Sequence, residues 1–113
     1  MTTIKIMSAS KYLPVIHPGE ILLEVYMVPL GLSQNKLAEA LDVDPGRVNR
    51  IVTGKNGITA DSALRLARYF GTTPQLWMNL QAKYDLEVAR TKKAAEIEKK
   101  VKICPRGALT VPA

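Results

Sequence analysis

Cysteine and long apolar runs are nearly absent from this 113-residue sequence. Cys104 is the only cysteine, so the chain can form no internal disulfide and no cysteine-based zinc site. No run of about eighteen apolar residues is present to span a bilayer, and residues 1–14 lack the long apolar block of a secretory signal. These absences predict a cytoplasmic protein that has no membrane partner.

Residue sets typical of catalysis are lacking as well. His17 is the only histidine, and no Ser, Cys or carboxylate lies at a recognisable catalytic spacing from it. Glu20 and Glu24 share one helix face, where solvent exposure and the helix dipole explain them without acid–base chemistry. We therefore expect a protein that is not an enzyme, with no metal site and no cofactor.

Positive charge is in excess, but it lies mainly at the C-terminal end. The formal net charge is +6, and residues 1–87 contribute only +1 of it, with 9 Lys and Arg against 8 Asp and Glu. Residues 88–113 carry 7 basic and 2 acidic residues, a net of +5. A nucleic-acid function for the central region must therefore be argued from residue pattern rather than from composition.

Helical periodicity dominates from about residue 18 onward, which predicts an all-α fold. Pro at the first position of a helix costs no hydrogen bond, because that N–H is unpaired in any helix. Ser33, Asp44, Thr59 and Thr73 are suited to cap helix starts. We predict five helices: one that runs from Pro18 and stops before Pro29 and Gly31, one over 34–41, one from Pro45 to Gly54, one over 60–71, and a long one from Pro74.

The second and third predicted helices have the proportions of a helix-turn-helix, two short amphipathic helices joined by a tight turn. Their shared core is predicted to comprise Leu37, Ala38, Leu41, Val43, Val48 and Ile51. If Val48 and Ile51 point inward, the other residues of this helix start must point outward or sideways: Pro45, Gly46, Arg47, Asn49 and Arg50. This turns the guanidinium groups of Arg47 and Arg50 towards the groove of a duplex.

This geometry suggests a role for each polar group on the helix pair. Gly46 allows close approach to DNA, Arg50 can bind guanine O6 and N7, and Asn49 can bind an adenine edge. Ser33 and Gln34, at the start of the second helix, are placed for a backbone phosphate. An ordinary solvated helix face is the alternative that spacing alone leaves open.

The segment "LSQNKLAEALDVDPGRVNRIVTGK" resembles the phage-repressor (Cro/C1, XRE) helix-turn-helix family. Together with "HPGEIL", "DSALRLARYFGT" and "LWMNLQAKYDL", it looks like a HigA-type (VapI) antitoxin over about residues 15–87. The resemblance implies a five-helix domain with a long C-terminal helix. We accordingly expect a flexible N-terminal segment over 1–14, a DNA-binding domain over 15–87, and a helix extension and tail over 88–113.

What the resemblance implies for function is an antitoxin that neutralises a RelE-like ribonuclease toxin and represses their shared operon by binding operator DNA. The family's DNA-facing positions fall here on Ser33, Gln34, Pro45, Gly46, Arg47, Asn49, Arg50 and Lys55. This chain departs from the family by having Gly46 where a long polar residue is common and Asn56 where a second basic residue is common. Specificity is therefore expected to depend more on Arg47 and Arg50.

One helix-turn-helix reads few base pairs, so we expect a homodimer on two half-sites about 34 Å apart or a multiple of that. Ile97 and Val101 lie too far along the last helix to pack on the same domain, which suggests a second subunit or the toxin as their cover. Two other functions stay open: a stand-alone phage-repressor-type regulator without a toxin, and a neutralising module that no longer binds DNA.

Overall fold

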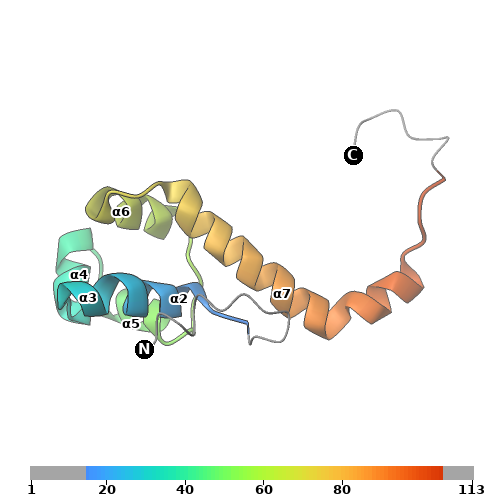
Figure 1. Ribbon diagram of the computed structural model, residues 1–113, viewed down its shortest axis with the longest axis horizontal. Coiled ribbons are helices and arrows are strands. Elements are labelled where there is room, and N and C mark those ends of the chain that lie inside the picture. The colour runs from blue at the N-terminus through green and yellow to red at the C-terminus, as the bar shows by residue number, and fades with distance from the viewer. Residues whose placement is uncertain (1–14, 106–113) are drawn as a thin grey trace.

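The computed structural model describes residues 15–105 of the chain (Figure 1). Over these residues the fold is all-α, as predicted, with a cluster of helices from which one long helix extends. The predicted N-terminal segment 1–14 and the end of the tail, 106–113, lie outside the described residues.

The first helix is longer than predicted and contains a π-helical segment. It runs continuously through α2 (Pro18–Ile21), the π-helical segment η1 (Leu22–Met27) and α3 (Val28–Leu30). It ends at Gly31, which has a φ of 65°. The prediction that it stops before Pro29 was wrong. The N–H of Val28 bonds to Leu23 O, five residues back, and such a π turn relaxes the regular backbone spacing that a proline ring disrupts.

The predicted helix-turn-helix is formed by α4 (Gln34–Leu41) and α5 (Pro45–Val52). Ser33 Oγ accepts from Lys36 N at 3.1 Å, and Asp44 Oδ2 accepts from Gly46 N at 2.9 Å, so both predicted caps are present. The turn between the helices passes through Asp42, which has a φ of 58°. Aspartate tolerates this left-handed conformation better than most residues, and the chain reverses within a few residues as a result.

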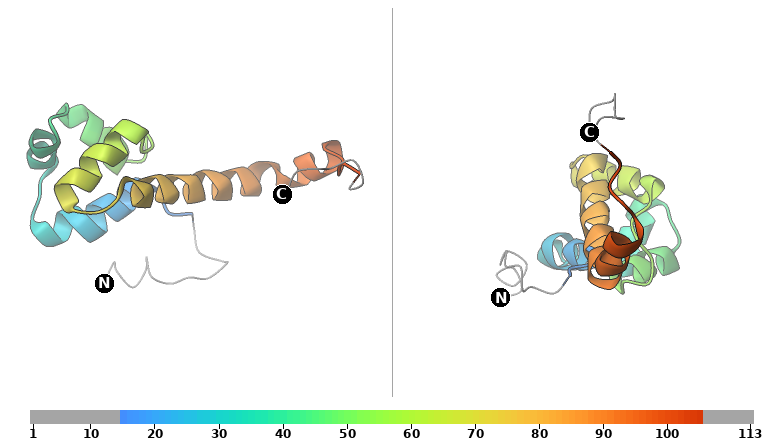
Figure 2. Two further views of the ribbon diagram at one scale, coloured as in Figure 1. Left: turned by 90° about the horizontal axis from the view of Figure 1, so that it is seen from above. Right: turned by 90° about the vertical axis from the view of Figure 1, so that its right-hand side faces the viewer.

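The last two helices are α6 (Ala60–Phe70) and α7 (Pro74–Lys100), capped by Thr59 and Thr73 as predicted. Helix α6 ends at Gly71, which has a φ of 73°. Helix α7 is 27 residues long and unbroken. Its first half packs along α6, whereas its second half extends away from the other helices (Figures 1 and 2).

The core is formed where all the helices except the distal part of α7 meet. Ala38 of α4 has no exposed surface, and Val48 and Ile51 of α5 are buried in the same core. Of the six residues predicted to form this shared core, five are buried, and Val43 packs against them while partly exposed. Trp77 of α7 is completely buried and donates from Nε1 to Thr72 Oγ1 at 2.8 Å.

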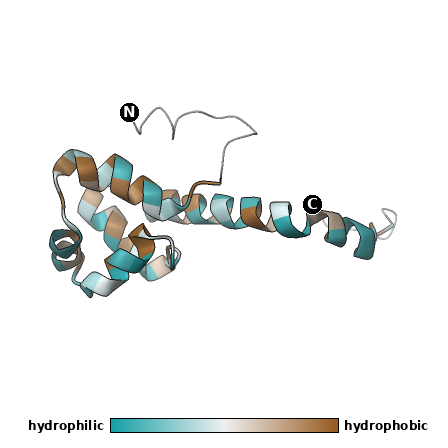
Figure 3. Ribbon diagram, turned by 90° about the horizontal axis from the view of Figure 1, so that it is seen from below, coloured by the Kyte–Doolittle hydropathy of each residue, from teal (hydrophilic) through white to brown (hydrophobic). Residues whose placement is uncertain are grey.

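The distal part of α7 exposes isolated apolar side chains. Leu86 and Ile97 are exposed to solvent. Val101 is exposed as well, but it was wrongly predicted to lie on this helix, which ends at Lys100 with Val101 extended. Figure 3 shows this part of the helix as mainly hydrophilic, with apolar residues interspersed. Within residues 15–105, no helix has both the length and the apolar character needed to cross a membrane.

His17 links the first helix to α7. Its Nδ1 accepts from Gly19 N at 2.8 Å, which caps α2, and its ring packs edge-on against Tyr84 with centroids 4.8 Å apart. Burial lowers the pKa of His17 below 6.5, while the negative charge of Asp85 acts in the opposite direction. An imidazole that accepts at Nδ1 is unprotonated there, so the cap requires the neutral ring.

Stability should therefore depend on pH through His17. Because its folded-state pKa lies below the unfolded value, its contribution is complete above about pH 6.5 and is lost as pH falls through the folded-state pKa. We expect the free energy of unfolding, measured by urea denaturation, to fall from about pH 7 to about pH 5. His17→Asn, which keeps an acceptor that does not titrate, should show a weaker dependence. Identical pH profiles for the two proteins would contradict this assignment.

Candidate nucleic-acid interface

The first turn of α4 contacts the middle of α5, and these two helices carry most of the predicted DNA-binding residues. Asn49 Nδ2 donates to Gln34 Oε1 at 3.0 Å, which joins the first turn of α4 to the middle of α5. Ser33, Pro45 and Asn49 are exposed, and Gln34 is half-buried. The structure therefore brings the two amide side chains together on one surface, although they are 15 positions apart in the sequence.

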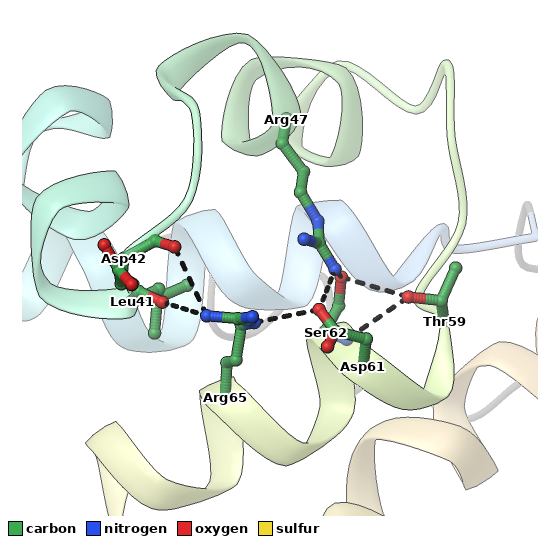
Figure 4. Close-up of polar contacts among 7 residues, drawn as sticks. All are labelled: Leu41, Asp42, Arg47, Thr59, Asp61, Ser62 and Arg65. Atoms are coloured by element: carbon green, nitrogen blue, oxygen red, sulfur yellow. Dashed lines mark hydrogen bonds and ion pairs between the residues drawn. The ribbon is translucent and has the colours of Figure 1, made fainter.

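Arg47 does not point where we predicted. Its Nη2 donates to Asp61 Oδ2 at 2.5 Å and to Ser62 Oγ at 2.9 Å, both on α6 (Figure 4). The prediction that Arg47 faces outward like Arg50 was therefore wrong. The reason is the carboxylate in the first turn of α6, which lies within reach of one arginine of α5 and binds it against the protein.

Asp61 is the centre of a network that sequence reasoning missed. The same Oδ2 atom also accepts from Arg65 Nε at 2.8 Å, and Arg65 Nη1 donates to the carbonyl oxygens of Leu41 and Asp42 at 2.9 and 3.2 Å (Figure 4). Hydrogen bonds from Arg65 and then from Arg47 hold the pKa of Asp61 below its usual value, and the bond to Asp61 raises the pKa of Arg65.

This network fastens both helices of the helix-turn-helix to α6. Arg65 holds the C-terminal end of α4, where the helix leaves carbonyl groups without partners, and Arg47 holds the first turns of α5. The spacing of Asp61 and Arg65, four apart on a predicted helix, was a visible signal for their own ion pair. Nothing local in the sequence indicated that Arg47 would join them.

Arg50 remains on the exposed side of α5. A Cβ atom placed on Gly46 would lie 3.0 Å from Arg50 Nη1 and 2.7 Å from Asp44 Oδ2, so the missing side chain leaves room for the guanidinium over the start of the helix. In the amide orientation that satisfies its neighbours, Asn56 accepts from Arg50 Nε at 3.2 Å. Gly46 thus has a role inside the protein as well as the predicted one towards DNA.

The loop after α5 continues the same basic surface. The carbonyl of Arg50 accepts from Lys55 N at 2.9 Å and from Asn56 N at 3.0 Å, which folds the loop back onto the end of α5. Lys55 is exposed. Arg47, Arg50 and Lys55 line one open hollow of about 610 Å³ between α5, this loop and α6. Arg47 is already paired with Asp61, and Asp85 also lines the hollow, so Arg50 and Lys55 are the cations there that could meet an anion.

Among residues 15–105, no group of three or more His, Cys, Asp or Glu side chains is arranged to hold a metal ion. His17 caps the start of α2 through its side chain. Cys104 is a free, exposed thiol.

The network around Asp61 should make the two arginines of α5 differ in their effect on stability. Arg47→Ala removes the contacts to Asp61 and Ser62, so we expect a lower urea midpoint at an unchanged denaturant slope. Arg50→Ala is the matched control, because it removes an arginine from the same helix without affecting α6. Equal midpoints for the two variants would show that the contacts of Arg47 do not hold α5 in place.

Known proteins of the helix-turn-helix type are similar to this chain over most of its length. A helix-turn-helix family model matches residues 23–77. Virulence-associated protein I of Dichelobacter nodosus is 57% identical over 81 residues, which cover 72% of this chain and 75% of that protein.

Two solved structures show how far the similarity extends in space. An addiction module antidote protein of the HigA family from Coxiella burnetii has a TM-score of 0.76 at 48% identity, covering 80% of this chain and 98% of that one. Pseudomonas aeruginosa antitoxin HigA, solved with the higBA promoter, has a TM-score of 0.79 at 42% identity, covering 81% and 100%. This chain belongs to the HigA-type (VapI) antitoxins of the phage-repressor helix-turn-helix family.

Proposed function

We propose that this protein is an antitoxin that binds operator DNA with the exposed face of α5 and thereby represses its own operon. The observation that carries the proposal is the polar face of α5, where Asn49 bonds to Gln34 of α4 and the guanidinium of Arg50 lies over Gly46 at the start of the helix, with both Asn49 and Arg50 exposed. Its similarity to a HigA protein solved with promoter DNA supports the same use. The site of action is the cytoplasm.

In this proposal α5 enters the major groove. Arg50 binds guanine O6 and N7, and Asn49 binds an adenine edge. Gln34 and Ser33 contact a phosphate of the backbone, and Lys55 contacts another from the loop. Pro45 and Gly46 form the part of α5 that approaches DNA most closely. Arg47 borders this surface with a side chain only 31% exposed, and we assign it to holding α5 rather than to reading a base.

The remaining part of the proposal concerns protein partners. Repression of an operon by a single small domain favours a homodimer, because two half-sites multiply the affinity of one. Ile97, exposed near the end of α7, and Val101, exposed directly after it, are proposed to be covered by a second subunit or by the toxin. The toxin is proposed to be a RelE-like ribonuclease encoded beside this protein.

A gel shift with the DNA upstream of the gene tests operator binding by this protein. Copurification of the product of the adjacent gene tests the toxin partner. A specific shift and a copurified toxin are expected. A shift without any toxin partner would favour the stand-alone regulator. A toxin partner without any shift would favour the neutralising module, which the near-neutral charge of residues 1–87 keeps open.

Arg50→Ala should weaken operator binding by about 1–3 kcal/mol and relax the preference at one base pair, because it removes a bidentate base contact. Fluorescence anisotropy on the operator and on single-base variants of it measures both effects. Arg68→Ala, which removes an exposed arginine from α6, is the control and should leave binding unchanged. An Arg50→Ala protein that keeps the full base preference would contradict the assignment.

Gln34→Ala should weaken binding to operator and to unrelated duplex alike, since phosphate contacts carry no sequence information. Gln34→Glu keeps an acceptor for Asn49 but sets a negative charge beside the phosphate, so it should bind more weakly than the alanine variant. The same anisotropy titrations provide the measurement. A loss confined to the operator sequence would show that Gln34 reads a base.

A further inference from the structure

Gln81 of α7 contacts the loop that follows the recognition helix α5. Its Oε1 accepts from Ile58 N at 2.6 Å, across 23 positions of sequence. A Cβ atom on Gly57 would lie 2.8 Å from three atoms of the Gln81 amide group, so this amide packs directly on the loop backbone. The side chain thus links α7 to the segment between α5 and α6.

The orientation of the Gln81 amide is set from its own helix. Gln81 Nε2 donates to Asp85 Oδ1 at 2.9 Å, one turn further along α7. Because a carboxylate accepts but does not donate, it attracts the NH₂ end of the amide and leaves the oxygen facing Ile58 N. The pair therefore acts as one unit, with Asp85 orienting the group that holds the loop.

The loop is held at its other end by α5, since the carbonyl of Arg50 accepts from Lys55 N and Asn56 N. Lys55 is itself attached to α5 through its backbone N–H, three residues before the attachment of Ile58 to α7, and it lines the basic hollow beside α5. Gln81 and Asp85 line the same hollow. The position of the lysine thus depends on one attachment at α5 and one at α7.

We propose that Gln81, oriented by Asp85, is a positioning residue of the DNA interface: it fixes the loop so that Lys55 meets a backbone phosphate while α5 lies in the groove. This role rests on the proposed function. It makes the proximal half of α7 part of the DNA-binding apparatus, although α7 itself touches no DNA.

The test compares variants that remove or restore the hydrogen bonds of Gln81 to Ile58 and Asp85. Gln81→Leu removes both bonds at similar volume. Gln75→Leu is the matched control, because Gln75 also lies on α7 and bonds one turn ahead, to Asn79, without contacting the loop. The double variant Gln81→Glu with Asp85→Asn exchanges carboxylate and amide, which restores both bonds at unchanged net charge.

Amide hydrogen exchange without DNA gives the first measurement. Exchange at Ile58 should be faster in Gln81→Leu than in wild type, and close to wild type in Gln75→Leu and in the exchanged pair. Unchanged protection in Gln81→Leu would show that the bond does not hold the loop, and would overturn the proposal whatever the protein binds.

Operator binding over a range of salt concentrations gives the second measurement. Gln81→Leu should bind roughly 5- to 20-fold more weakly, and the slope of log affinity against log salt should fall by about 1, the change expected for one lost phosphate contact. Adding Lys55→Ala to Gln81→Leu should then cause little further loss. The exchanged pair should restore both affinity and slope.

Three results would count against the inference in different ways. Wild-type binding by Gln81→Leu would overturn the role of Gln81 alone. Additive losses with an unchanged salt slope would mean that Gln81 only stabilises the fold. No binding by the wild-type protein would refute the proposed function itself. If Gln81→Leu does not fold, Asp85→Ala, a change at an exposed residue, should still speed hydrogen exchange at Ile58, and wild-type exchange there would overturn the inference.

Discussion

The burial of Val48 and Ile51 is the constraint on which the rest of the structure depends. These residues lie three apart on α5 and are 2% and 5% exposed. Their burial fixes the rotation of α5 about its axis, and so decides which of its polar residues face solvent. Close packing strengthens this constraint, because a Cβ atom on Gly19 would overlap Ile51 O, and Ala38 has no exposed surface. Helix α5 is therefore held by backbone contact as well as by its side chains.

The two arginines of α5 illustrate how neighbouring groups of the same chemistry acquire different roles. Arg47 meets the carboxylate of Asp61 on α6, and its hydrogen bonds hold α5 against the domain. Arg50 extends over the place that a side chain at position 46 would occupy, on the exposed side of the helix. A charge that is already paired with a carboxylate is less available to DNA than one that faces solvent. The different roles of the two arginines follow from the position of Asp61, whose carboxylate binds Arg47.

Helix α7 combines two environments in one unbroken segment. Its first turns are part of the core through the buried Trp77, and its next turn carries Gln81 to the loop beside α5. Its distal part leaves the domain, where Ile97 is 49% exposed and nothing local covers it. Because α7 is one unbroken helix, its distal end is connected directly to the turns that contact the loop after α5. The proposed partner surface and the proposed DNA surface share this one element.

The helices, their caps and most of the core were predictable from sequence, because each depends on residues only a few positions apart. Ser33, Asp44 and Thr59 cap their helices through N–H groups two or three residues ahead, and the spacing of Val48 and Ile51 defines the buried face. The continuation of the first helix through Pro29 was not predictable, because a π turn is a backbone adjustment that leaves no simple residue pattern.

Other features were decided only by tertiary structure. Arg47 meets Asp61 across 14 positions, and Gln81 meets Ile58 across 23, so each contact exists only after separate helices have packed. Periodicity specifies the direction in which a side chain leaves its own helix, but the group at the far end of a long side chain binds whatever another helix presents there. The sequence by itself therefore determined which surface of α5 is polar, whereas the packing of α6 and α7 determined which of those polar groups remain available to a partner.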